Sequence, residues 1–294
     1  MAEKDIAEKI LADYNDVFAD IMNGFLFHGK QIVSPNDLIR SNTNSQYKTG
    51  NGEVHEQERD VAKYLKKNGL TVVMTGFEHQ TKAEKFMPLR QIGYDGAGYR
   101  EQILDKKRKR AYPVITLVLY FGLKPWKYSR HLTEVLDIPD VYRPFVSDYE
   151  MKNLCQVAFL TPEQVKCFRS DFRYVADYFV QKRLTGKYRA SVDTINHVDA
   201  TLKLMSIITG STKFRNAATE FSSRKEGVSM RDVLDSVENK GKKKGMIQGY
   251  NKAQRENVVR MLDLGKFSRE DIAAALGITV DAVEKIEQQE MNLT

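Results

Sequence analysis

The sequence predicts an α/β fold, in which a mixed central sheet is flanked by helices and an all-helical extension follows on the C-terminal side. Three observations support this prediction. A period-2 pattern surrounds the turn signal Asn68-Gly69, a near-continuous apolar run spans Val114–Tyr120, and apolar residues recur at helical spacing after residue 160. Strands and helices mixed in this way pack as helical layers on a sheet.

The segments that precede the sheet are predicted to be a helix and a loop. Apolar residues at helical spacing predict an amphipathic helix over residues 6–27. Residues 41–58 are polar and rich in turn formers, with Gly50-Asn51-Gly52 at their centre. We expect a loop there that leads into the first core strand.

The stretch before Glu78 is a predicted hairpin, and its register decides which side chains share a face. A two-residue Asn68-Gly69 loop pairs Asp60 with Phe77 and places Glu78 on the opposite face from Asp60. A three-residue loop, with its glycine in the left-handed conformation, pairs Asp60 with Gly76. Asp60 and Glu78 then share a face, and we expect this second register.

In that register Asp60, Glu78 and Gln80 converge at one end of the hairpin. Two carboxylates a few ångströms apart repel each other unless a cation lies between them, and a hard divalent ion prefers oxygen ligands. Such an ion stabilises charge on a phosphate and lowers the pKa of a bound water. On residue types alone the alternative stays open that two surface acids end the strands and Gln80 caps the next helix.

Four further elements are expected along the chain. A helix is predicted from about Lys85 to Lys107, and a buried strand over Leu154–Leu160. Thr161 is the expected N-cap of the next helix, with Pro162 in its first turn. A second helix is expected at about Val192–Thr209.

Positive charge gathers on the segment that contains these acids. The chain has a net charge of +7, and the stretch from Asp60 to Arg130 alone holds 15 Lys and Arg against 6 Asp and Glu. A basic surface beside acidic ligands suits a polyanion such as nucleic acid. A solvated basic face is the alternative.

Candidate phosphate-binding cations lie within this segment. Arg90 is early enough in its helix to face the site and hold a phosphate. Lys82, two residues past Gln80, is placed to supply an ammonium there. The densest basic run is either a phosphate-binding patch or a solvated turn, and it consists of Lys106, Lys107, Arg108, Lys109 and Arg110.

Several motifs in order resemble a known family. The runs RDVAKYL, FEHQ, MPLR and YDGAGYREQ, followed by PVITLVLYFGLKPW, are similar to the Rpn family of recombination-promoting nucleases, also described as YhgA-like putative transposases. The opening helix at Tyr14–Leu38 is similar as well, so the resemblance covers roughly residues 14 to 180. It implies a PD-(D/E)xK restriction-endonuclease-like core.

The resemblance also implies roles for the candidate residues. It makes Asp60 the first ligand and Glu78 the second ligand of a Mg2+ or Mn2+ ion. Gln80 stands where most nucleases of the superfamily have a lysine. The Glu-x-Gln form is usual in this family, and it leaves open which group orients the attacking water.

The function implied is that of a Mg2+-dependent deoxyribonuclease, an endonuclease that hydrolyses phosphodiester bonds. We expect little sequence specificity because nothing in the sequence encodes base readout. Recombination, mobile elements and phage defence are the contexts that the family suggests. The alternative is a catalytically weak or inactive protein of nuclease fold that binds DNA or a protein partner, and the missing lysine favours it.

The tail differs in composition. Lys240–Lys252 is rich in lysine and glycine and predicts a linker or a weak helix. A helix-turn-helix pattern follows, with Ser268 as N-cap and Gly277 at the turn. Its last segment, Thr279–Glu290, has a net charge of −3, which disfavours contact with phosphates. We therefore expect a packing or partner-binding hairpin, with a homo-oligomer among the options.

These compositions predict three regions. Residues 1–188 form the nuclease-like domain, 189–239 a helical extension, and 240–294 the Lys/Gly-rich linker with the helix-turn-helix-like tail. The charged start MAEKDIAEK and the lack of a long apolar run predict a cytoplasmic protein without a signal peptide or a membrane span. Cys155 and Cys167 are too few for a zinc site or a disulfide framework.

Overall fold

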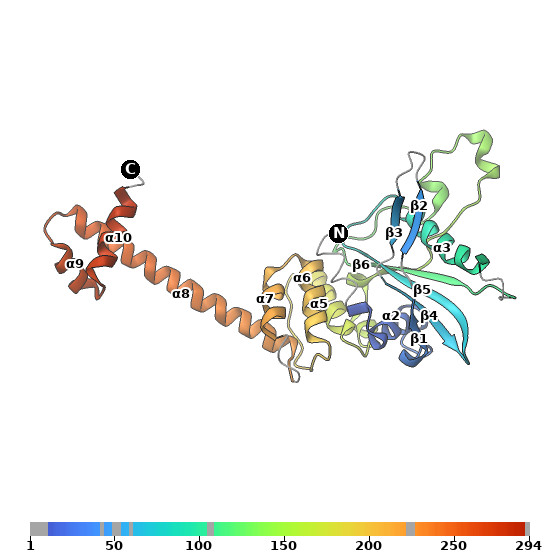
Figure 1. The fold of residues 1–294 in the computed structure, drawn as a ribbon, viewed down its shortest axis with the longest axis horizontal. Helices are drawn as coiled ribbons and strands as arrows, with labels where there is room; N and C mark the ends of the chain where they lie inside the picture. Colours follow the sequence, from blue (N-terminus) through green and yellow to red (C-terminus); the bar gives the residue numbers. More distant parts are fainter. Residues whose placement is uncertain are drawn as a thin grey trace. The chain divides into compact units, whose positions relative to one another are not determined.

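A computed structural model of the chain describes residues 11–41, 44–48, 54–58, 61–104, 109–221 and 227–291. The chain divides into two compact units, Met1–Val233 and Leu234–Thr294 (Figure 1).

A five-stranded mixed sheet forms the centre of the first unit. Its strands are β1 (Leu38–Arg40), β4 (Val61–Lys67), β5 (Leu70–Gln80), β6 (Val114–Tyr120) and β7 (Leu154–Gln156), in the order β1-β4-β5-β6-β7. The pairs β1–β4 and β4–β5 are antiparallel, whereas β5–β6 and β6–β7 are parallel. The predicted mixed central sheet is confirmed.

Helices surround this sheet. Among the described residues of the first unit, the helices with defined bounds are α2 (Asn15–Phe27), α3 (Met87–Leu104), α4 (Pro162–Val165), α5 (Phe172–Thr185), α6 (Val198–Thr209) and α7 (Thr212–Phe221). Short 3-10 helices occur in the connections of the described part: η1 (Pro35–Asp37), η2 (Leu132–Glu134), η3 (Asp140–Phe145) and η4 (Val157–Phe159).

The two faces of the sheet are covered by different helices (Figure 1). On one face, Tyr94 of α3 packs with Val118 of β6 in a buried cluster. On the other face, Phe18 of α2 stacks on Phe77 of β5, with ring centroids 4.2 Å apart. Because side chains alternate along a strand, the even-numbered residues of β5 lie on the α3 face and the odd-numbered ones on the α2 face.

The β4–β5 hairpin turns through two residues, so the predicted three-residue loop is wrong. Asn68-Gly69 have φ values of 52° and 76°, as a type I′ turn requires, and Lys67 pairs with Leu70. A bulge then shifts the register by one residue, so that Ala62 pairs with Gly76. Even-numbered residues of both strands therefore share a face, as expected. The cause is the bulge, which the sequence did not predict, and not a three-residue loop.

The polar segment before β4 contains strands where a loop was expected. β2 (Asn44–Lys48) and β3 (Val54–Glu58) form a separate antiparallel pair. The polar composition of this segment gave no hydrophobic alternation from which to predict strands. Strands can form there because backbone pairing satisfies the N–H and C=O groups whatever the side chains are. The predicted turn Gly50-Asn51-Gly52 lies outside the described residues.

The segment after β6 follows the prediction only in part. The strand expected over Leu154–Leu160 ends after three residues, and η4 continues the chain. The cap is confirmed: Thr161 Oγ1 accepts a hydrogen bond from Gln164 N at 3.2 Å, and Pro162 is the first helical residue.

The single helix expected after Thr161 is divided into α4 and α5. At the break, the carboxylate of Asp20 accepts hydrogen bonds from the backbone N–H groups of Arg169 and Ser170, at 2.8 and 2.7 Å. These bonds satisfy donors that a continuous helix would otherwise use. The next helix, expected from Val192, begins later at Val198.

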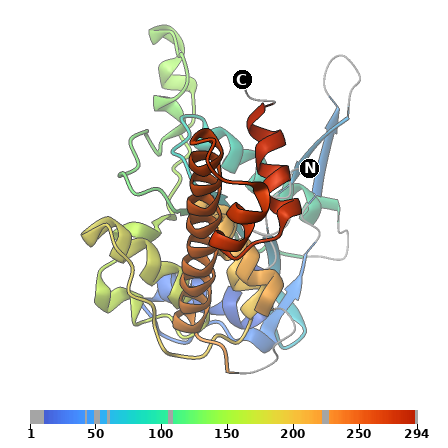
Figure 2. The ribbon, with the colours of Figure 1, turned by 90° about the vertical axis from the view of Figure 1, so that its left-hand side faces the viewer.

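The second unit is helical (Figure 2). It comprises most of α8 (Met230–Asp263) together with α9 (Arg269–Leu276) and α10 (Val280–Met291). The C-terminal part of α8 packs against α9 and α10 through a buried cluster of Val258, Ile272, Ala273 and Val283.

Two expectations for the second unit have clear outcomes. Of the linker and the weak helix expected for Lys240–Lys252, the helix is found, as part of α8. The helix-turn-helix pattern is confirmed in outline, since Ser268 caps α9 in a capping box with Asp271 and Gly277 ends it with a φ of 65°.

Candidate functional site

The candidate site lies at the C-terminal end of β5. Glu78 is only 2 % exposed there and pairs with Val118 of β6. The strand alternation places its side chain on the α3 face. Burying an ionised carboxylate costs several kcal/mol unless a partner compensates the charge, so the neighbours of Glu78 decide what it can do.

The main partner is Arg90, from the first part of α3. Its Nη2 donates to Glu78 Oε1 and, at 3.0 Å, to the Tyr94 hydroxyl, while its Nη1 donates to Glu84 Oε2 at 2.7 Å. Burial opposes the positive charge, but Glu78, Tyr94 and Glu84 outweigh it and raise the pKa of Arg90. The guanidinium is therefore a permanent cation that joins two carboxylates.

Gln80 completes this group. It lies two residues beyond Glu78 on the same face of β5, and its Nε2 donates to Glu78 Oε1 at 3.2 Å. Glu78 Oε1 thus accepts from both Gln80 and Arg90. This arrangement concentrates hydrogen-bond donors on one buried carboxylate.

The donor chemistry bears on a metal ion. Carboxylate and amide oxygens suit a hard divalent cation, and Mg2+ commonly takes only one or two carboxylates. The described residues contain no group of three or more His, Cys, Asp or Glu side chains that could hold a metal. Within them, Arg90 is the cation beside Glu78, so a metal ion would have to share that carboxylate with the guanidinium or replace it.

The structure brings some of the candidate residues together. Glu78, Gln80 and Arg90 form one contact group, whereas Lys82 is exposed. Asp60 lies outside the described residues.

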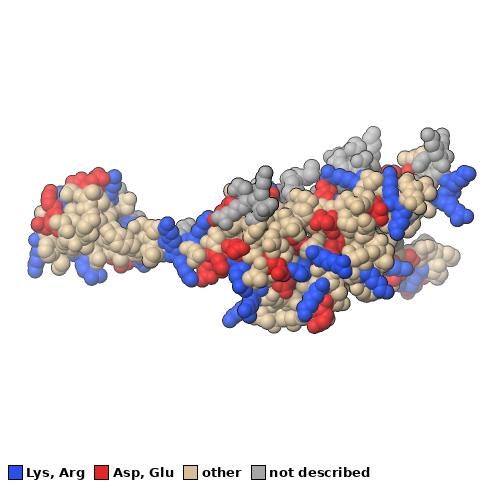
Figure 3. Space-filling model, turned by 90° about the horizontal axis from the view of Figure 1, so that it is seen from below, with Lys and Arg blue, Asp and Glu red and all other residues tan. Residues whose placement is uncertain are grey.

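Only part of the basic run can be placed. Lys109 and Arg110 are exposed and line a shallow hollow together with Tyr99 and Ile103 of α3. Lys106, Lys107 and Arg108 lie outside the described residues. On the face drawn in Figure 3, Lys and Arg side chains are interspersed with Asp and Glu.

A buried polar network beside the site was missed from the sequence. Asp95 of α3 accepts from Thr116 Oγ1 at 2.6 Å and from the Tyr149 hydroxyl. Gln91 donates to the same hydroxyl at 2.9 Å. Gln91 and Asp95, one helical turn apart, were the available signal, because polar residues on the buried side of a helix need partners.

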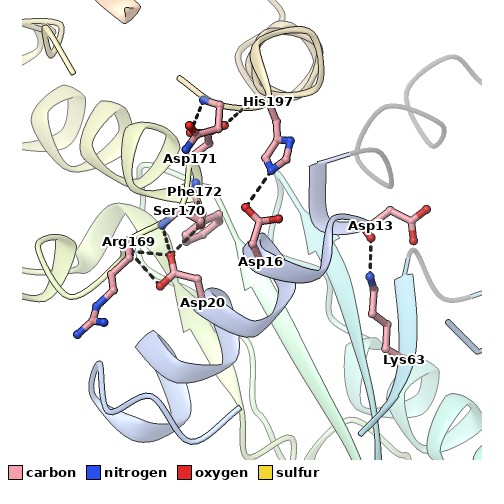
Figure 4. Close-up of polar contacts among 10 residues, drawn as sticks. Asp13, Asp16, Asp20, Lys63, Arg169, Ser170, Asp171, Phe172 and His197 are labelled. Atoms are coloured by element: carbon pink, nitrogen blue, oxygen red, sulfur yellow. Dashed lines mark hydrogen bonds and ion pairs between the residues drawn. The ribbon is translucent and has the colours of Figure 1, made fainter. Parts of the chain in front are cut away.

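A second polar cluster lies on the α2 face of the sheet (Figure 4). Lys63 of β4 is 2 % exposed, and its ammonium donates to the main-chain oxygen of Asp13 and to Asn15 Oδ1. Burial lowers the pKa of Lys63, while the charge of Asp13 opposes that shift. Nearby, His197 Nε2 lies 2.9 Å from Asp16 Oδ2.

These contacts have a structural role. Lys63 ties the start of α2 to the sheet, and the Asp16–His197 pair ties α2 to the start of α6. With the Asp20 contacts described above, they fix the start and the middle of α2. No sequence signal marked them, since the paired residues are far apart in the chain.

The segment that contains the site has known relatives. Residues 60–180 match the family described as putative transposase, YhgA-like. The resemblance predicted from the sequence is thus confirmed over these residues. The YhgA-like segment includes Glu78, Gln80 and Arg90, and the family description indicates a transposase- or nuclease-like role with DNA as the partner.

No curated protein and no solved structure matches the chain. Among the helices that the structure describes, none is long and apolar enough to span a bilayer.

Proposed function

We propose that this protein is a Mg2+- or Mn2+-dependent DNA endonuclease of low sequence specificity, built on a PD-(D/E)xK-like core. The observation that supports it best is the buried carboxylate of Glu78 at the end of a central strand, bonded by Gln80 and Arg90. A buried acid in contact with a specific cation is typical of functional sites. The family match over the same segment supports a nucleic-acid substrate.

Each residue has a role in the proposal. Glu78 binds the divalent ion, together with Asp60, whose part rests on the family resemblance. When bound, the ion supplies charge stabilisation at the phosphate and a more acidic water. Gln80 orients that water by hydrogen bonding. The Arg90 side chain is 37 % exposed, and its planar fork matches the oxygens of a phosphate as well as those of carboxylates.

Cleavage of supercoiled plasmid tests the proposal directly. Purified protein should convert it to nicked and then linear DNA with Mg2+ or Mn2+. EDTA should abolish the reaction, because Glu78 and Asp60 alone leave the phosphate charge uncompensated. Ca2+ should support binding with little cleavage. Intact plasmid under every metal condition would refute the enzyme.

A second candidate is a DNA- or partner-binding protein of the same fold without nuclease activity. Two observations favour it: Gln80 stands where most of the superfamily has lysine, and Arg90 already compensates the charge of Glu78. The two candidates differ in one result. The binding protein would retain duplex DNA in EDTA and in Mg2+ alike and release it uncut. Recombination, mobile elements or phage defence would be the setting of either activity.

A further inference from the structure

The middle of α8 has an extreme charge composition. Residues 240–255, KGKKKGMIQGYNKAQR, contain six Lys and Arg and no Asp or Glu. This stretch of +6 compares with +7 for the entire chain. An uninterrupted positive stretch of this length on one helix is the electrostatic pattern of a surface that meets a polyanion.

The side chains of this stretch are also highly exposed. From residue 238 to 253 every side chain that the structure describes is exposed, on all sides of the helix. The exposed residues include apolar ones: Met246 is 73 % exposed and Tyr250 is 61 % exposed. Core packing therefore does not account for this part of α8, in contrast to its C-terminal part, which packs against α9 and α10.

The stretch is also weak as an isolated helix. Gly241, Gly245 and Gly249 each cost about 1 kcal/mol relative to alanine in a helix interior. A Cβ added at any of the three would have nothing within 4 Å, so close packing does not explain them. Two of its lysines form ion pairs with acids outside the stretch, Lys242 with Glu238 at 2.6 Å and Lys252 with Glu256 at 3.8 Å. A ligand that neutralises the lysines would stabilise this helix.

Duplex DNA fits these properties. The major groove is about 12 Å wide and admits one α-helix, and 16 helical residues extend about 24 Å. Successive residues of a helix point about 100° apart, so the cations of this stretch face several directions. Within a groove, such cations reach the phosphates of both walls, whereas a flat surface would use only one side of the helix.

We propose that residues 240–255 of α8 bind duplex DNA, in the major groove and mainly through phosphates. This contact is separate from the Glu78 site and does not depend on cleavage. It also differs from readout by α10, whose acidic residues face phosphate repulsion. The glycines keep the helix thin, and Tyr250 and Met246 supply apolar contact within the groove.

The test measures DNA affinity without chemistry. The full chain with Glu78→Gln, in EDTA, is titrated against a labelled 24-base-pair duplex at several NaCl concentrations. A triple variant, Lys242→Gln, Lys243→Gln and Lys252→Gln, removes three charges from α8. We expect its log–log salt slope to be smaller by about 2 to 3, since each phosphate contact contributes about 0.9.

A matched control removes the same charge elsewhere. Lys187, Lys203 and Lys213 are exposed lysines outside the two basic segments, and Lys203 has an i,i+4 pair with Asp199 like that of Lys242. Their triple replacement by glutamine should leave the slope within about one unit of the parent. An equal decrease of the salt slope in both triple variants would overturn the proposal, because the net charge of the chain alone would then explain DNA binding.

Two further readouts complete the test. Hydrogen exchange of residues 240–255 should slow when duplex DNA is added, and circular dichroism should show that the α8 triple variant keeps its helix content. Unchanged exchange would overturn the proposal. So would a loss of self-association in the α8 variant with DNA affinity unaltered, which would assign this face to a second copy of the chain.

Discussion

Glu78 is a buried acid whose charge is compensated by Arg90. Its side chain is 3 % exposed, whereas that of Arg90 is 37 % exposed. The acid is thus desolvated while its partner still reaches solvent. This asymmetry suits a site in which the cation can be exchanged, because Arg90 gives up less hydration than Glu78 to form the pair.

At the residue scale, strand parity was enough to predict that Glu78 and Gln80 share a face. Arg90 could be placed near them because it lies one turn into a helix that starts soon after β5. The partners of Asp95 could not be predicted, since Tyr149 is 54 residues away and reaches it through a loop. Contacts of this kind depend on tertiary packing, which leaves no local sequence pattern.

Gln80→Lys distinguishes two roles for Gln80. The amide donates to Glu78 Oε1, and a lysine would keep a donor at that position. If Gln80 acts only by hydrogen bonding, plasmid cleavage should be retained or raised. A clear fall in the rate would instead indicate that the amide oxygen binds the metal, because an ammonium would repel the ion.

Lys63→Met should change how stability depends on pH. Burial lowers the pKa of Lys63 below 10.5, so the unfolded chain binds more protons than the folded one between the folded pKa and 10.5. The free energy of unfolding of the wild type gains a contribution that rises with pH over that window. The gain should vanish in Lys63→Met, as measured by urea unfolding from pH 7 to 10.5.

The exposed neighbour Lys67 serves as the control for this experiment. Lys67→Met should give a pH profile parallel to that of the wild type. A Lys63→Met profile that also runs parallel would show that the buried ammonium is not linked to folding.

At the scale of elements, length and hydrophobic pattern predicted the long helices and strands but did not predict the short ones. The helix expected from about Lys85 to Lys107 is α3, and the apolar run is β6. The break between α4 and α5 escaped prediction because apolar residues continue at helical spacing across it. There the Asp20 hydrogen bonds override the local pattern.

Gly98 and Gly96, two residues apart in α3, should respond oppositely to alanine. A Cβ at Gly98 would lie 2.9 Å from Met74 Sδ and 3.1 Å from Val114 Cγ2, where α3 meets the sheet. Gly98→Ala should lower the free energy of unfolding by about 1 to 2 kcal/mol. Gly96→Ala meets nothing within 4 Å and should raise it by about 0.5 to 1 kcal/mol. Thermal melts that move in the same direction would refute the close contact between α3 and the sheet.

For the whole molecule, charge is the property that sequence alone located best. Residues 60–130 contribute +9 and residues 240–255 contribute +6, so the remainder of the chain is −8. The net positive charge of the chain therefore comes from these two stretches. The sequence left open whether this second stretch is a linker or a weak helix, and it is a helix.

Neutralising the run Lys106–Arg110 with glutamines should flatten the salt dependence of DNA binding. Each lost phosphate contact lowers the slope by about 0.9. The affinity of the full chain for a duplex in EDTA, measured between low and physiological salt, checks this. An unchanged slope would identify the run as a solvated turn.

The most direct test of the central claim is plasmid cleavage by Glu78→Gln in Mg2+. Glutamine keeps the size and the hydrogen bonds of the side chain but removes the charge that binds the cation. We predict that the cleavage rate falls by at least about 100-fold, with duplex binding in EDTA preserved. Glu134→Gln, which neutralises an exposed acid, should cleave like the wild type. Cleavage by Glu78→Gln at the wild-type rate would contradict the account.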